Sequence, residues 1–163
     1  MNAGLLRRYR LALGFFIAGL VFGGLTAFPL LTELRLLAGW LGITNPADYA
    51  QLAGLPHWIA RVLFALEQNQ RDFPFLAYGT DWLAFGHLCI AVFFIRPWLK
   101  PLESDWVLQC GLVCCAAVIP AALIAGQIRG IPFYWRLIDS SFGIIGAIPL
   151  LYCLWLTRRM RES

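Results

Sequence analysis

The sequence predicts an all-α membrane protein: a bundle of four transmembrane helices, with one or two interfacial helices in a long first loop on the outer side. Two observations favour this fold. Hydrophobic residues make up 60% of the 163 residues and charged residues only 13%, whereas a soluble domain has about 25% charged residues. The apolar residues also gather into four runs, and the length of each run is close to the roughly 20 residues that a membrane helix needs. The length suits a single membrane domain over residues 1–163.

The predicted spans cover about residues 11–31, 78–95, 106–126 and 138–156, and the outer loop covers residues 32–77. The first span follows three arginines, as a signal peptide does, but its apolar run is too long and no small-residue cleavage motif follows. We therefore expect it to be retained. Pro120 and Pro149 lie inside the last two spans, where neighbouring groups can satisfy the freed carbonyls. Five tryptophans fall at span ends, as expected at headgroup depth: Trp82, Trp98, Trp106, Trp135 and Trp155.

Basic residues indicate the orientation. Eight of the 13 lie on one predicted side: Arg7, Arg8, Arg10, Arg96, Lys100, Arg158, Arg159 and Arg161. By the positive-inside rule this side is cytoplasmic. We therefore expect a multi-pass protein of the inner (plasma) membrane with both termini in the cytoplasm. The basic residues flank apolar runs rather than cover one soluble face, so the net charge of +4 does not indicate nucleic-acid binding. Twelve arginines against one lysine suggest GC-rich codon usage and a bacterial source.

The outer loop has helical patterns of its own. Asn45, Pro46 and Asp48 are typical of a helix start, with an N-cap, a proline in the first turn and a nearby acid. A second helix is expected near Pro56, where apolar residues recur at helical spacing: Ile59, Val62, Leu63 and Leu66. Such helices often lie flat at the membrane interface. The loop is either a lid over the ends of the bundle or a docking surface for a partner.

Small residues four apart allow membrane helices to pack closely. The first span contains Gly19, Gly23 and Ala27 at this spacing, and the fourth contains Gly143 and Ala147. These residues predict helix packing, either inside the bundle or in a homo-oligomer or a complex with another membrane protein. The five cysteines lie in apolar segments without disulfide or zinc spacing, so we expect buried free thiols.

Polar residues gather at the predicted outer ends of the spans, where a closed bundle would bring them together. They form the candidate polar cluster: Glu33, Arg35, Asp81, His87, Gln127, Arg129, Arg136 and Asp139. Charges in apolar segments are costly and are usually paired or functional. One interpretation is a structural network, in which Arg136 pairs with Asp139 along one helix and Asp81 pairs with Arg129 between helices. The other is a polar pocket, open to the outer leaflet, that binds a ligand or a substrate.

His87 is the cluster residue able to titrate near neutral pH. Asp81 lies about 240° away around the same helix, so the two side chains do not share a face. His87 therefore needs a partner from another span, with Asp139 or Glu33 the best candidates. No cofactor is predicted: haem ligation would require both His57 and His87 and is disfavoured, and no metal site or phosphate-binding motif is present.

Residues 79–87 (GTDWLAFGH) and 128–139 (IRGIPFYWRLID) resemble segments of small four-span bacterial membrane proteins of unknown function. The resemblance covers most of the chain and implies a four-span fold without a known activity. In architecture alone, the chain is similar to the four-span sterol-isomerase and sigma-2-type receptor family. That family binds sterol-like ligands in a bundle containing acidic residues. Its motifs do not match this chain residue by residue, so no site residue is carried over.

Three functional hypotheses follow, and in each of them the protein lies in the lipid bilayer. The first is a non-catalytic protein that assembles with itself or with another membrane protein. It ranks highest because the small-residue spacing is present and no known catalytic motif is. The second is a protein that binds a lipid or small hydrophobic ligand at the outer polar cluster, with or without enzymatic activity. The third is a minimal transporter, ranked last because there is no internal repeat and no charge at the predicted midplane.

Overall fold

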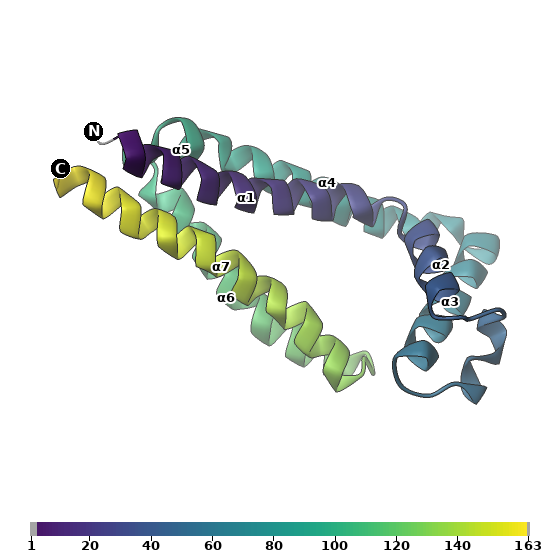
Figure 1. The fold of residues 1–163 in the computed structure, drawn as a ribbon. Coiled ribbons are helices and arrows are strands. Elements are labelled where there is room, and N and C mark those ends of the chain that lie inside the picture. Colours follow the sequence, from purple (N-terminus) through teal and green to yellow (C-terminus); the bar gives the residue numbers. More distant parts are fainter. Residues whose placement is uncertain (1–2, 163) are drawn as a thin grey trace. The chain divides into compact units, whose positions relative to one another are not determined.

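The computed structural model describes residues 3–162, whose regular structure is entirely helical (Figure 1). The all-α prediction is therefore confirmed. Four helical segments are long and apolar enough to cross a membrane: α1 (Ala3–Ala27), the segment Pro74–Leu99, α6 (Asp105–Ile128) and α7 (Phe133–Glu162). Their closure into one bundle and the interfacial position of the loop helices remain predictions.

Contacts divide the described chain into two compact units. Unit 1 contains the chain up to Leu20 and from Cys89 onward, and unit 2 contains Val21–Leu88. Each unit is described by itself. The predicted single domain remains a prediction, and it also takes in residues 1, 2 and 163, which lie outside the described part of the chain.

Unit 1 is built around a core to which three helices and Phe94 contribute. Tyr9 and Leu13 of α1 meet Phe94, which lies just after α4 (Tyr78–Phe93), and Leu108 of α6. The last helix supplies the remaining buried side chains: Leu150, Cys153, Leu156 and Met160. A shared core of this kind requires α1, α6 and α7 to come together at one end of the unit.

Two side chains bond backbone carbonyls of α1 at this end. The Cys153 thiol donates to the Tyr9 carbonyl at 3.7 Å. The indole Nε1 of Trp98, in the short helix α5 (Ile95–Leu99), donates to the Arg10 carbonyl at 3.0 Å. Both ends of the described chain and α5 therefore lie at the same end of unit 1 (Figure 1). The basic residues that the sequence assigns to one side of the membrane belong to these segments.

Glycines allow α6 and α7 to run side by side in contact (Figure 1). A Cβ atom at Gly143 would overlap the carbonyl oxygen of Cys115, and one at Gly146 would lie 3.1 Å from the Cys115 sulfur. The turn between the helices depends on Gly130, which has φ of 68°. Its N–H bonds the Gln127 carbonyl, and the next N–H bonds the Gly126 carbonyl. This is a Schellman cap, which favours glycine at the left-handed position.

Prolines move two of the predicted span boundaries. The sequence predicts a first span to residue 31, but α1 ends at Ala27 and α2 begins at Leu30, because Pro29 cannot continue the hydrogen-bond ladder and its ring clashes with the preceding turn. The second predicted span is likewise interrupted at Phe94, one turn before Pro97. Pro120 and Pro149, in contrast, stay inside α6 and α7 as expected.

Unit 2 contains the predicted outer loop, which folds into four helices: α2 (Leu30–Trp40), η1 (Pro46–Gln51), α3 (Gly54–Asp72) and η2 (Pro74–Ala77). The cap predicted at Asn45 is confirmed, since its side chain accepts a hydrogen bond from the N–H of Ala47 at 3.2 Å. The apolar face of α3 is also confirmed: Ile59 and Leu63 are buried, as is Ala38 of α2. The sequence does not predict α2, because its residues read as the end of the first span.

We predict that Gly143→Ala destabilises unit 1, because the new methyl group would overlap a backbone carbonyl that cannot turn aside. The expected loss is about 1–3 kcal/mol in free energy of unfolding, measured by titrating the detergent-solubilised protein with sodium dodecyl sulfate. Gly86→Ala in α4 is the control, because no described atom lies within 4 Å of its Cβ position. Equal stability of the two variants would contradict the close contact.

Candidate functional site

The candidate polar cluster is divided between the two units. Unit 2 holds Glu33, Arg35, Asp81 and His87, and unit 1 holds Gln127, Arg129, Arg136 and Asp139. The convergence of the eight side chains, and the pair between Asp81 and Arg129, would join the two units and remain predictions. Within each unit the surroundings of each side chain are defined.

Arg35 links two helices of unit 2. Its Nε lies 2.9 Å from a carboxylate oxygen of Glu67, so the pair connects α2 to α3. The Arg35 side chain is 56% exposed, and an ion pair of this kind contributes little to stability. Glu33, in the first turn of α2, is exposed. These two cluster residues therefore belong to the surface of the α2–α3 pair.

Asp81 lies in a groove of unit 2 that is otherwise lined by aromatic rings. The groove has a volume of about 320 Å³ and its lining residues, which define the aromatic groove, are Phe28, Tyr78, Asp81, Trp82 and Phe85. Four of them come from α4 at spacings of three and four residues, so they share one helix face. Within unit 2, no described side chain pairs with the Asp81 carboxylate. The groove thus combines a large apolar surface with one unpaired negative charge.

Three of the four rings in the aromatic groove contact one another. Trp82 makes edge-to-face contacts with Tyr78 and with Phe85, at centroid distances of 5.9 Å and 5.8 Å. Edge-to-face packing is a favoured arrangement of aromatic pairs. From the sequence, Trp82 is expected only in the headgroup belt, and Phe28, Tyr78 and Phe85 are not predicted as site residues. The i, i+3, i+4, i+7 spacing around Asp81 was the signal that could have found the three α4 residues.

His87 finds its hydrogen-bond partner on its own helix rather than on another span. Its Nδ1 lies 2.9 Å from the carbonyl oxygen of Leu83. A carbonyl only accepts, so Nδ1 carries the proton and the neutral ring keeps Nε2 as an acceptor. The imidazole lies beside α1, with Cδ2 4.0 Å from the position of a Cβ at Gly23. His87 therefore lies against α1, while Asp81 lies among the aromatic rings.

Arg136 does not form the predicted pair with Asp139 in unit 1. Its Nη1 donates to the carbonyl of Leu123 at 3.2 Å. Gly126 makes this possible, because Cγ and Cδ of Arg136 lie 2.6 Å from the position where a Cβ at Gly126 would be. The guanidinium carbon also lies 5.3 Å from the ring centroid of Phe133. The missing side chain at Gly126 directs the arginine toward α6 and away from Asp139.

The neighbouring polar groups of α7 are also used locally. The hydroxyl of Ser140 donates to the Arg136 carbonyl at 2.8 Å, and that of Ser141 donates to the Ile138 carbonyl at 2.6 Å. Asp139 is half-buried beside them. Gln127 and Arg129 are exposed at the end of α6. In unit 1, the cluster residues thus form no side-chain network among themselves in the described structure.

The predicted helix-packing residues have different surroundings. The close contact between α1 and α4 in unit 2 is made by Gly24, whose Cβ position lies 2.9 Å from the Ala84 carbonyl oxygen. Gly19 has no described atom within 4 Å of its Cβ position. Ala27 is the last residue of α1. In α7, Gly143 meets α6, and Ala147 lies one turn further along the helix.

Neither histidine lies in a metal-binding group. His57 Nδ1 bonds the Tyr49 carbonyl at 2.7 Å, so this ring also keeps Nε2 as an acceptor. Among residues 3–162, no group of three or more histidine, cysteine or acidic side chains is arranged to hold a metal ion. The five cysteines are free thiols, but the expectation that they are buried holds only for Cys153. Cys114 is exposed and the other three are partly exposed.

No protein-family model, no curated protein and no solved structure matches this chain. The resemblance to small four-span bacterial proteins therefore remains a prediction.

We predict that the aliphatic part of Arg136 matters more for stability than its charge. Arg136→Met keeps a long side chain over Gly126, whereas Arg136→Ala leaves the space empty. The alanine variant should lose about 2–3 kcal/mol, as for a cavity left by a long side chain, and the methionine variant about 1 kcal/mol for the lost hydrogen bond. Denaturant titration of both variants checks the order, and equal losses would show that the charge dominates.

Proposed function

We propose that this protein is a multi-pass protein of the bacterial inner membrane that binds an amphiphile, a lipid or a lipid-like small molecule, in the aromatic groove. The single observation that supports this function is the groove itself, in which Asp81 lies among four aromatic side chains. Its volume of about 320 Å³ is at the lower end of the range for small-molecule sites. An elongated ligand would be bound in part, with its remainder in the surrounding lipid.

The chemistry of the lining favours a particular kind of ligand. An apolar chain gains from the rings, and an unpaired carboxylate beside them favours a ligand group that carries positive charge or donates hydrogen bonds. An ammonium group next to an acyl chain meets both conditions. Such a ligand would pair its charged group with Asp81 and would keep its apolar part against Tyr78, Trp82 and Phe85.

We further propose an orientation in the membrane. Both termini are cytoplasmic, the four long helices close into a bundle, and α2 and α3 lie at the outer interface. The aromatic groove then faces the outer leaflet, because Phe28 follows α1 and Tyr78 begins α4 at their outer ends. Aromatic side chains at this depth fit the headgroup region, where the charged part of an amphiphile is found.

We predict that Asp81→Asn weakens binding of lysophosphatidylethanolamine, a single-chain lipid with an ammonium group. Losing a charged hydrogen-bond acceptor costs about 1.5–3 kcal/mol, so the Kd should rise about tenfold or more. Native mass spectrometry of the detergent-solubilised protein at several lipid concentrations measures the Kd. Trp82→Ala should weaken binding as well, because it removes the central ring of the groove.

Asp72→Asn is the matched control, since it removes the same charge from an exposed position at the end of α3. Its Kd should stay within about twofold of the unmodified protein. If Asp81→Asn behaves like Asp72→Asn and Trp82→Ala leaves the Kd unchanged, the groove is not the binding site.

A second candidate function is assembly, and Gly19 is the observation that favours it. Gly19 lies in an apolar helix with open space around its Cβ position, between the exposed side chains of Phe15 and Phe22. An exposed small residue in a membrane helix allows another helix to approach closely. In this case α1 would contact a second copy of the chain.

If α1 mediates self-association, Gly19→Ile should reduce the oligomer because the branched side chain blocks the close approach. Size-exclusion chromatography with light scattering in a mild detergent measures the protein mass. Gly86→Ile is the control, because Gly86 also has open space around it but lies on α4. A monomeric unmodified protein, or an oligomer unaffected by Gly19→Ile, would rule out this interface.

A further inference from the structure

A second groove lies in unit 1, at the end where both described chain ends meet α5. Its volume is about 330 Å³, and its lining residues define the basic groove: Val92, Ile95, Arg96, Leu99 and Lys100. Val92 lies in α4, Ile95, Arg96 and Leu99 lie in α5, and Lys100 follows α5 directly. Three are aliphatic and two are cationic, so the groove has an apolar part and a positively charged part.

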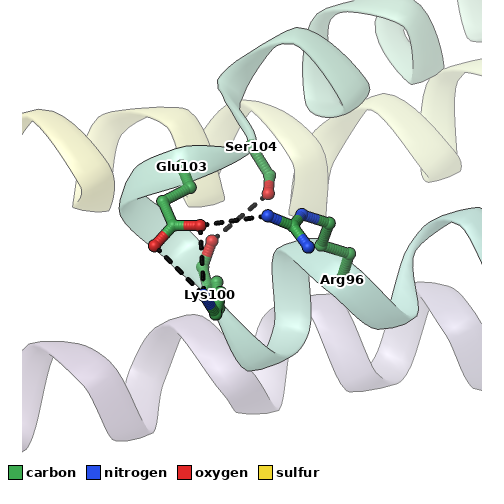
Figure 2. Close-up of polar contacts among 4 residues, drawn as sticks. All are labelled: Arg96, Lys100, Glu103 and Ser104. Carbon is green, nitrogen blue, oxygen red and sulfur yellow. Dashed lines mark hydrogen bonds and ion pairs between the residues drawn. The ribbon is translucent and has the colours of Figure 1, made fainter.

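One carboxylate pairs with both cations, as Figure 2 shows. Arg96 Nη2 lies 3.1 Å from Glu103 Oε2, and Lys100 Nζ lies 3.4 Å from the same oxygen. The Ser104 hydroxyl donates to the Lys100 carbonyl at 3.3 Å, which fixes the turn that carries Glu103. One carboxylate therefore pairs with two cations. Arg96, Lys100 and Glu103 together keep an excess of one positive charge.

The two cations remain accessible despite this pairing. The Arg96 side chain is 67% exposed and that of Lys100 is 56% exposed. Both keep donors that Glu103 does not occupy, since a guanidinium has five N–H groups and an ammonium has three. An anion can therefore bind both side chains while the carboxylate stays where it is.

The surroundings of the basic groove are also positive. This end of unit 1 carries eight basic side chains against the acidic residues Glu103, Asp105 and Glu162. Asp105 is already paired with Arg161 at 2.8 Å. Positive charges gathered at a membrane surface attract anionic lipids.

We propose that the basic groove binds an anionic phospholipid, with its phosphate between Arg96 and Lys100 and an acyl chain along Val92, Ile95 and Leu99. The aliphatic residues favour a lipid over a free phosphate, because inorganic phosphate would leave the apolar part of the groove uncovered. This site is separate from the aromatic groove, lies in the other unit and prefers the opposite ligand charge.

The test compares dioleoyl-phosphatidylglycerol with dioleoyl-phosphatidylcholine, which has the same chains but no net charge. Native mass spectrometry of the full-length protein in detergent measures both Kd values. Phosphatidylglycerol should bind about tenfold more tightly. The double variant Arg96→Gln/Lys100→Gln should lose this preference, whereas Arg158→Gln, which removes one exposed positive charge at the same end outside the groove, should change the Kd less than twofold.

Glu103→Gln provides an independent test in the opposite direction. Removing the competing carboxylate should tighten phosphatidylglycerol binding about threefold, an effect that a damaged fold would not produce. The proposal is overturned if the double variant binds as Arg158→Gln does, if phosphatidylcholine binds as tightly as phosphatidylglycerol, or if Glu103→Gln weakens binding. Displacement of the lipid by inorganic phosphate at similar concentration would also overturn it, since the acyl chain would then contribute nothing.

Discussion

The structure depends on how its polar side chains are satisfied inside apolar helices. Where no water is available, each hydrogen-bonding group must find its partner in the protein. In this chain the partner is usually a backbone carbonyl: His87 bonds Leu83, Arg136 bonds Leu123 and Trp98 bonds Arg10. Ser140 and Thr157 do the same within α7. Within the candidate polar cluster, His87 and Arg136 are thus bonded to the backbone and Arg35 pairs with Glu67. Asp81 has no described side-chain partner within unit 2 and lies among aromatic rings.

Much of the fold could be predicted from composition and local chemistry. Long apolar runs indicated the helices, and Asn45 with Pro46 indicated the start of η1, because these signals depend on residues close in sequence. The end of α1 at Ala27 was missed because an apolar run predicts length and does not show that Pro29 begins a separate helix. Pro149 stays inside α7, whereas the helix is interrupted one turn before Pro97, so a proline alone does not predict where a helix ends.

The candidate site was harder to predict, because the charge of a residue does not show which partner its side chain contacts in the folded protein. The pairing of Arg136 with Asp139 failed because Gly126, ten residues away on α6, opens a space that only the folded structure reveals. Arg35 found Glu67 on a helix 32 residues later. The aromatic groove was within reach of the sequence, because Tyr78, Asp81, Trp82 and Phe85 share a face of one helix. The sequence pattern did not predict it because Trp82 was interpreted only as an interfacial residue.

The core of unit 1 imposes an order on biosynthesis. The carbonyl of Tyr9 is bonded by Cys153, 144 residues later in the chain. At a translation rate of about 5–20 residues per second, α1 waits roughly 7–29 s before its partner is made. During that time, its buried face is open to lipid, to chaperones or to the membrane-insertion machinery. A ribosome that stops before α7 would leave the buried face of α1 without the α7 side chains that cover it.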